Sequence, residues 1–345
     1  MNATPGSPMG MSGEVLPDVA TKSPLRGAIE RKQWTADSGQ AWVVVMLLVI
    51  FAAYTGYRSQ DFWTLRNWQV LVQPLAEAGL VTIGMMVVIA SGGIDLSVGS
   101  TIGLASVTAA LVARHGHGTV ATDFAALLTG TAAGSFNGLL IGCLELPPVL
   151  VTLANMVLFS GIAVTLTAGN SITGLPNGVL WLGDATLFGV PAAFILFTVV
   201  VAITSLLVNK GLWGRYVLAI GCNPVAARFS AMPVAATRWS IYTLQGALCG
   251  LTAVVMMARL ASARADMGQA LMLISIAAVV LGGTPITGGS VSVLGTVAGV
   301  CTFYVVQNGL TLLGVSPFLQ TALVSALLLV AATIGAMLRH KRPEG

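Results

Sequence analysis

Apolar runs of about twenty residues recur along this chain between residues 41 and 338, separated by short polar segments. A helix needs about that many apolar residues to cross the hydrocarbon core of a bilayer. Charged residues make up only 8% of the 345 residues, against about 25% in soluble domains, and the mean hydropathy is +0.88. A soluble core cannot bury so much apolar surface, whereas lipid solvates it. The sequence therefore predicts an all-α, polytopic membrane protein.

The apolar runs predict about ten transmembrane helices, counted by the length a span requires. The run 271–281 is short for a full crossing, so we expect it to be broken or re-entrant. The predicted spans are Trp42–Tyr57, Val70–Ala90, Leu96–Ala113, Phe124–Leu144, Val149–Ala168, Val190–Val208, Trp239–Arg259, Leu271–Leu281, Val293–Leu313 and Pro317–Leu338.

Polar segments at both ends frame this membrane domain. Residues 1–40 are rich in Pro, Gly and Ser without apolar periodicity, which predicts a disordered cytoplasmic tail. Residues 41–338 form the transmembrane domain, with a long cytoplasmic loop at about 209–238, and residues 339–345 form a second cytoplasmic tail.

The distribution of Lys and Arg sets the expected orientation, because cytoplasmic segments of membrane proteins are enriched in both. With both termini inside, most basic residues fall in inside segments. Those are Lys22, Arg26, Arg31, Lys32, Lys210, Arg215, Arg228, Arg238, Arg339, Lys341 and Arg342. The outside segments then hold Arg58, Arg66, Arg114, Arg259 and Arg264.

The net charge of +4 comes from residues at the edges of apolar runs rather than from one basic face, so no nucleic-acid partner is expected. The four cysteines, Cys143, Cys222, Cys249 and Cys301, lack C-x-x-C spacing and are interpreted as small apolar residues. We expect no metal site and no cofactor.

Two glycine-rich segments interrupt the apolar pattern, at 91–100 and 281–290. Each follows an apolar helix and precedes another. Glycine pairs permit positive φ and sharp reversals, and broken segments in two halves of a transporter often line its pathway. The alternative is a tight turn in which Asp95 or Ser97 caps the next helix. The motif residues are Gly92, Gly93, Asp95, Ser97, Gly282, Gly283, Gly288 and Gly289.

Neither glycine segment is a nucleotide site. A phosphate-binding loop needs the pattern G-x-x-x-x-G-K-[ST], and the second segment contains no lysine. The chain is therefore not expected to hydrolyse ATP, and a separate subunit must do so if transport is ATP-driven.

Glu77 is an ionisable residue inside a predicted span, where it costs about 2.5–3.5 kcal/mol unless a cavity, a partner or a helix end receives it. A proton relay is one interpretation, although the span holds no second carboxylate and no histidine lies deep in a span. The alternative is a structural or path-lining role. Other polar residues could line a path or hydrogen-bond between helices. The candidate path residues are Glu77, Asn137, Asn155, Gln307 and Asn308, with Gln245 as a further polar residue.

The middle loop contains the pattern of a short capped helix. Asn223 precedes Pro224, an arrangement in which asparagine caps a helix whose first residue is proline. The predicted helix is small, partly apolar and cytoplasmic, which suits docking into a groove on a soluble partner. The candidate docking residues are Gly221, Asn223, Pro224, Ala226, Ala227, Arg228 and Ser230.

Five segments together resemble the permease subunits of bacterial ribose-type sugar ABC importers. They are 91–100, 221–231, 258–268, 277–296 and 307–315. The chain departs from the family pattern Gly-Gly-x-Gly at Ser290-Val291. The resemblance extends over most of the chain from about Asn67 to Ile334.

The resemblance implies a subunit of the bacterial inner membrane that imports a monosaccharide by alternating access. It implies a second permease chain, identical or not, two cytoplasmic ATP-binding subunits and a periplasmic sugar-binding protein. It also implies that 221–231 is the helix that couples to the ATPase, and that 264–266 is similar to permeases for rhamnose or autoinducer-2. The rival hypotheses are an ion-coupled secondary sugar carrier and an integral membrane enzyme, although no H-E-x-x-H or G-x-S-x-G pattern supports the latter.

Overall fold

The computed structural model describes residues 44–46, 48–316, 318–320, 322–323 and 326. All of them belong to one unit, Asp37–Gly345. The predicted tails at 1–40 and 339–345 and most of the last predicted span lie outside the described residues.

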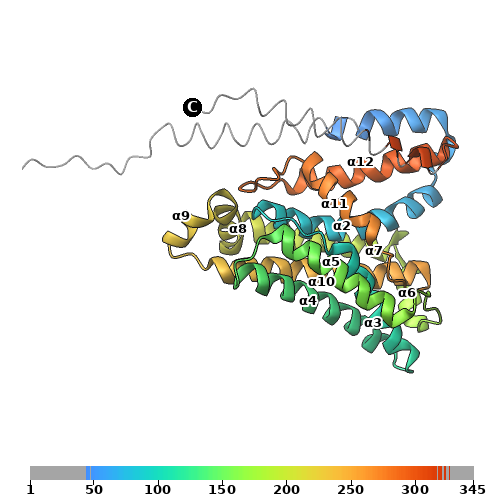
Figure 1. Cartoon of the computed structure of the whole chain (residues 1–345). Coiled ribbons are helices and arrows are strands. Elements are labelled where there is room, and N and C mark those ends of the chain that lie inside the picture. The colour runs from blue at the N-terminus through green and yellow to red at the C-terminus, as the bar shows by residue number, and fades with distance from the viewer. Residues whose placement is uncertain (1–43, 47, 317, 321, 324–325, 327–345) are drawn as a thin grey trace, which may run out of the picture. The chain divides into compact units, whose positions relative to one another are not determined.

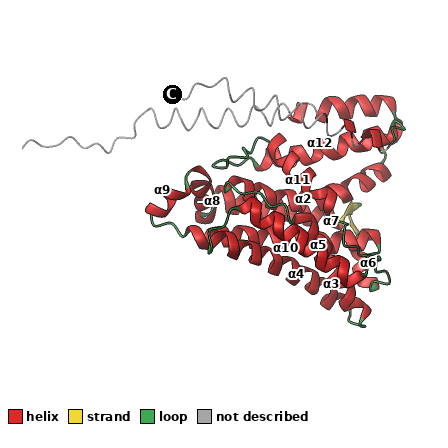
Figure 2. Ribbon diagram, viewed as in Figure 1, coloured by secondary structure: helices red, strands yellow, loops and turns green. Residues whose placement is uncertain are grey.

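Helices make up nearly all of the regular structure in the described residues (Figures 1 and 2). A helix over Val44–Arg58 precedes the labelled elements. Those are η1 (Gln60–Trp63), α2 (Leu65–Ala90), α3 (Val98–Arg114), α4 (Thr119–Gly142), α5 (Pro148–Thr167), α6 (Asn177–Asp184), β1 (Thr186–Leu187), β2 (Val190–Pro191), α7 (Ala192–Asn209), α8 (Leu212–Cys222), α9 (Pro224–Phe229), α10 (Val234–Leu260), α11 (Gln269–Leu281) and α12 (Val293–Leu312).

Helix α2 forms the centre of the bundle. Its most apolar stretch is 83% buried, and that of α10 is 78% buried, whereas those of α5 and α7 are only 28% and 22% buried. The sequence sets the ends of α2. The Thr64 side chain accepts a hydrogen bond from the Asn67 N–H at the start, and Gly92, with φ of 82°, turns the chain away after the end. Residues 78–90 of α2 are all buried and, apart from Thr82, apolar, as expected for a helix segment enclosed by protein on all sides.

Glycines let α4 pack directly on α10 (Figure 1). Four of them follow each other at every fourth position of α4 and so lie on one face of the helix. A Cβ added at Gly134 would collide with the backbone at Tyr242 and Gly246 of α10. Small residues at this spacing allow membrane helices to approach until their backbones touch. The contact residues are Gly130, Gly134, Gly138 and Gly142 on α4 and Ala235, Trp239, Tyr242, Gly246 and Gly250 on α10.

Six helices of the described part are long and apolar enough to cross a bilayer. They are α2, α4, α5, α7, α10 and α12, and each coincides with a predicted span. Three other predicted spans are shorter helices, namely Val44–Arg58, α3 and α11. The run at 271–281 lies in one unbroken helix of 13 residues, so it is short but not broken, and a re-entrant placement remains a prediction. The total of ten spans remains a prediction.

The middle segment differs from the predicted loop. Residues 209–238 contain the end of α7, all of α8 and α9 and the first turn of α10. Helix α8 was missed because its 11 residues are too few for a span and contain Gly214 and Arg215, yet it buries Gly214, Val217 and Ile220 on one face. The segment between α5 and α7 also contains structure that the sequence did not indicate, namely α6 and the hairpin of β1 and β2, which turns at Phe188 and Gly189.

Helices α8 and α9 lie at one end of the long helices and α6 at the other (Figure 1). Contacts agree with this arrangement. Arg228 of α9 pairs with Glu145 just beyond the end of α4, whereas Gly178 of α6 lies against Thr119 at the start of α4. The bundle therefore has an α8–α9 end and an α6 end.

Replacing Gly134 by alanine should destabilise the protein, because the new Cβ would force α4 and α10 apart. Overpacking of this kind costs about 1–3 kcal/mol, more than the roughly 1 kcal/mol that alanine gains over glycine in a helix. Thermal unfolding of the purified protein in detergent measures the change. Gly161→Ala in α5 is the matched control, since no atom lies within 4 Å of its added Cβ. It should be neutral or stabilising, and equal melting of both variants would contradict the assigned contact.

Candidate functional site

The two glycine breaks lie against each other at the α8–α9 end of the bundle. The Gly289 N–H donates a hydrogen bond of 2.9 Å to the carbonyl oxygen of Ala90, the last residue of α2. Gly92, Gly288 and Gly289 have φ values of 82°, 82° and 84°, which only glycine adopts without strain. A Cβ at Gly288 would meet the Gly92 backbone. The breaks thus form one backbone junction, although 199 positions separate the residues of its hydrogen bond along the sequence.

Asp95 forms a tight turn before α3, whereas no side chain caps the first N–H groups of that helix, so the predicted cap by Asp95 or Ser97 is absent. Its carboxylate accepts hydrogen bonds from the Ser97 N–H at 2.9 Å and the Ser97 hydroxyl at 2.6 Å, just before α3 begins at Val98. The carboxylate is buried, and this burial raises the pKa of Asp95, while the two Ser97 hydrogen bonds act in the opposite direction. Asp95 therefore shapes the entry into α3.

A chain of hydrogen bonds extends from Asp95 through two candidate path residues. The Asn137 amide of α4 donates to the Ser97 hydroxyl at 2.8 Å, and the Asn155 amide of α5 donates to the Asn137 carbonyl oxygen at 2.6 Å. The Thr152 hydroxyl of α5 donates to the Ile94 carbonyl oxygen at 3.1 Å. These contacts tie the first break to α4 and α5, as interhelical hydrogen bonds do in membrane proteins. Path lining by Asn137 and Asn155 remains a prediction.

The other two amide candidates differ from each other. Asn308 of α12 and Asn67 of α2 exchange amide hydrogen bonds of 2.9 and 3.1 Å, which join the two helices near the start of α2. Gln307 is exposed at the surface of α12. The structure therefore brings Asn137 and Asn155 together but places Asn308 and Gln307 elsewhere. Gln245 of α10 is fully buried, and its side-chain oxygen has no partner among the described residues.

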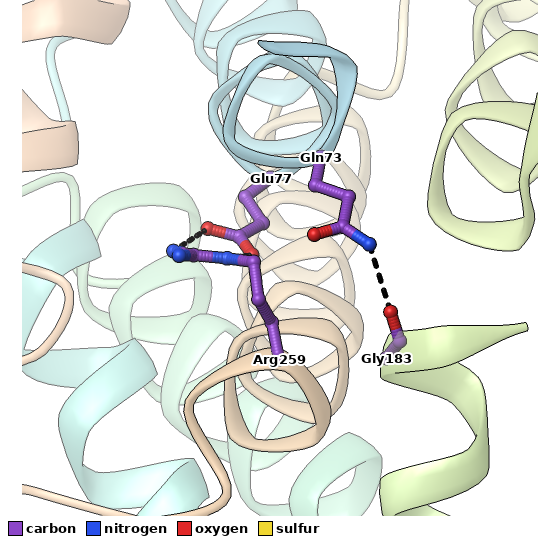
Figure 3. A network of polar contacts seen from close by, with 4 residues as sticks. All are labelled: Gln73, Glu77, Gly183 and Arg259. Atoms are coloured by element: carbon purple, nitrogen blue, oxygen red, sulfur yellow. Dashed lines mark hydrogen bonds and ion pairs between the residues drawn. The ribbon is translucent and has the colours of Figure 1, made fainter. Parts of the chain in front are cut away.

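Glu77 lies in the protein interior and pairs with Arg259 of α10 (Figure 3). The guanidinium donates two hydrogen bonds to the two carboxylate oxygens, at 2.5 and 2.8 Å. The Glu77 side chain is 2% exposed and that of Arg259 is 31% exposed. Two parallel bonds of this kind fit the planar fork of arginine to a carboxylate. One turn away on α2, the Gln73 amide donates to the Gly183 carbonyl oxygen of α6 at 2.8 Å (Figure 3).

Arg259 is the last residue of the span predicted at Trp239–Arg259, and in the structure it lies in the last turn of α10, which ends at Leu260. The sequence did indicate that the Glu77 carboxylate, inside a predicted span, needs a partner of opposite charge. Nothing in the sequence identified which arginine it was, because 182 positions separate the two residues.

The segment of the predicted docking helix has the expected cap. The Asn223 side chain accepts hydrogen bonds of 3.0 Å from the N–H groups of Val225 and Ala226, and α9 begins at Pro224. Ala227 is buried, whereas Val225 and Phe229 are 61% and 89% exposed. The helix thus presents apolar side chains outward from the α8–α9 end.

The segment 261–268 packs on the bundle beside α3 at the α6 end. Ala263 forms a bridge to Ile172 with hydrogen bonds of 2.9 Å in both directions, and the Ser106 hydroxyl of α3 donates to the Arg264 carbonyl oxygen at 3.3 Å. The exposed side chains of Arg264 and Asp266 pair at 2.9 Å. Hydrogen bonding to this guanidinium lowers the pKa of Asp266.

Comparison with known proteins gives one family match and several similar permeases. Residues 74–332 match the family described as "Branched-chain amino acid transport system / permease component". The autoinducer 2 import system permease protein LsrD of Photorhabdus luminescens is 36% identical over 259 residues, which cover 73% of this chain and 78% of that protein. The ribose import permease protein RbsC of Bacillus subtilis is 37% identical over 266 residues, covering 76% and 83%. No solved structure matches the chain at a significant level.

Replacing Glu77 by glutamine should cost about 2 kcal/mol of stability, because it removes the charge-assisted hydrogen bonds between a buried carboxylate and a partly exposed arginine. Adding Arg259→Gln should recover part of the loss, since two amides can hydrogen-bond to each other. Unfolding of the purified variants in detergent measures both effects.

The control for this experiment is Glu145→Gln, which breaks the pair with Arg228 at 2.9 Å. Both side chains of that pair are 56% exposed, so the change should stay below about 1 kcal/mol. Similar losses for Glu77→Gln and Glu145→Gln would contradict a buried, stabilising pair.

Proposed function

We propose that this chain, which belongs to the permease-component family of transport systems, is the membrane-spanning subunit of an ATP-driven importer. Its cargo is a monosaccharide or a related small sugar, and its place is the inner membrane of a bacterium. The chain itself performs no chemistry on the cargo, and separate cytoplasmic subunits bind and hydrolyse ATP.

The observation that carries the proposal is α9, together with the family membership. A helix of six residues with a complete asparagine cap protrudes from the α8–α9 end and exposes Val225 and Phe229. These two residues are four positions apart and so share one face of the helix. An apolar helix face of this kind suits a groove on a partner protein. We assign that groove to the ATP-binding subunit.

The orientation follows from the charges at the two ends. The α8–α9 end carries Lys210, Arg215, Arg228 and Arg238, with Glu145 and the buried Asp95 as acidic residues in the described part. Basic residues are enriched on the cytoplasmic side, so we place this end inside and the α6 end in the periplasm. Both termini are then cytoplasmic, with tails at 1–40 and 339–345 and about ten spans between 41 and 338.

The proposed cargo follows from the similar proteins rather than from a pocket. The family description names branched-chain amino acids, whereas the similar permeases named above are import proteins for ribose and autoinducer 2. We therefore propose ribose, rhamnose or autoinducer-2 as the first candidates. A periplasmic sugar-binding protein would deliver the cargo at the α6 end.

A second permease chain, identical or not, completes the proposed transporter. Helices α2 and α10 are enclosed by their own neighbours, whereas α5 and α7 are mostly uncovered and available to lipid or to a second chain. Alternating access would then arise from movements of the two permeases against each other, driven through α9.

The pairing of Glu77 argues against the ion-coupled alternative. Its two carboxylate oxygens are both occupied by the Arg259 guanidinium, so the carboxylate is neutralised without a bound proton or sodium ion. A carrier of that class requires a site that gains and loses the coupling ion during the cycle.

Reconstitution in liposomes tests the proposed function. Labelled ribose, rhamnose and autoinducer-2 should enter only when the chain is combined with its ATP-binding and sugar-binding partners and with ATP. Uptake by the chain alone under a proton or sodium gradient would contradict the proposal and favour a secondary carrier.

Replacing Phe229 by aspartate should weaken the association with the ATP-binding subunit at least tenfold, because a charge would enter the proposed apolar contact. The effect is measured in detergent, by co-purification of the two subunits and by the dissociation constant of the ATP-binding subunit from the permease. Phe188→Asp is the control, since Phe188 is 98% exposed on the hairpin near the α6 end. Equal affinities for both variants would show that α9 is not the docking helix.

A further inference from the structure

Helix α9 is attached firmly to the end of α8. Asn223 is the residue that both ends α8 and caps α9. Ile220 of α8, Ala227 of α9 and Val234 of α10 form a small buried cluster with Met232 beside it. The Met232 N–H also donates to the Ala227 carbonyl oxygen at 3.1 Å. A displacement of α9 must therefore move the last turn of α8, because no flexible linker separates them.

The last turn of α8 touches the glycine junction through bare backbone. A Cβ added at Gly221 would collide with the Ala90 carbonyl oxygen and with the Gly289 N–H group. These are the two groups that form the hydrogen bond between the breaks. The next residue, Cys222, places its Sγ 3.5 Å from the Gly289 carbonyl oxygen. Gly221 lies within a regular helix, so close approach rather than an unusual φ accounts for its glycine.

The junction in turn holds two parts of the membrane domain. Ala90 ends α2, and its carbonyl has no partner within the helix, so the Gly289 N–H satisfies it. Gly289 belongs to the segment that connects α11 to α12, and Gly282 at the start of this segment packs against Gly295 in the first turn of α12. The end of α8 therefore contacts the central helix and the α11–α12 pair at one point.

We propose that Gly221 and the two glycine breaks form the joint through which movement of α9 reaches α2 and the α11–α12 pair. Backbones in direct contact transmit a displacement with little slack, since no side chain between them can change rotamer to absorb it. Gly221 is then a positioning residue for transport. This inference rests on the proposed function, because it assumes that an ATP-binding subunit moves α9.

Replacing Gly221 by alanine tests the joint in the complete reconstituted transporter. The added Cβ separates α8 from the junction, so uptake of the sugar that the wild type imports should fall at least fivefold per ATP hydrolysed. Gly161→Ala is the matched control, with open space around its Cβ, and should keep the wild-type ratio. An unchanged ratio for Gly221→Ala in a folded transporter would overturn the joint.

The native Cys222 supplies a second measurement that does not depend on the folding of a variant. In a Cys143→Ala background, which removes the other exposed cysteine of the described residues, the rate of Cys222 modification by a maleimide reports the closure of the joint. The rate should change at least threefold between the nucleotide-free and ATP-bound transporter. The same rate in both states would overturn the inference, whereas an absence of ATP-dependent uptake in the wild type would overturn the proposed function instead.

Discussion

Direct contact between backbones at glycine positions is the interaction on which this structure depends. It occurs along the crossing of α4 and α10, where four glycines of α4 face α10. It occurs again where Gly221, Ala90 and Gly289 meet. Lipid provides no hydrophobic driving force between membrane helices, so their association relies on close packing and on polar contacts. The absence of a Cβ at these positions permits the required approach.

Polar contacts complete the same framework. The hydrogen-bond chain from Asp95 to Asn155 joins the first break to α4 and α5, and the Asn67–Asn308 pair joins α2 to α12. The Glu77–Arg259 pair joins α2 to the end of α10. Each contact satisfies groups that would be costly to leave unpaired away from water. Helix association thereby accounts for the hydrogen bonds of these polar residues inside the spans.

The sequence predicted the class, the long spans, the cap at Asn223 and the turn at Asp95 because these depend on neighbouring residues. Asn223 before Pro224 and Asp95 before Ser97 each contain a complete hydrogen-bonding pattern within a few positions. The sequence did not identify Arg259 as the partner of Glu77, and it did not indicate α8, α6 or the glycine face of α4. An 11-residue helix with mixed polarity gives a weak signal, and a glycine spacing of four is informative only once the facing helix is known.

The sequence by itself determined that this chain crosses a membrane, because its apolar runs have the length that a bilayer requires. It also determined the family, because the ordered motifs extend over most of the chain. Only the tertiary structure decided which arginine neutralises Glu77 and that both glycine breaks meet the end of α8. Glu77 and Arg259 are 182 positions apart in the sequence, and Ala90 and Gly289 are 199 positions apart. Pairings at such separations are set by how the helices pack, which local residue patterns do not specify.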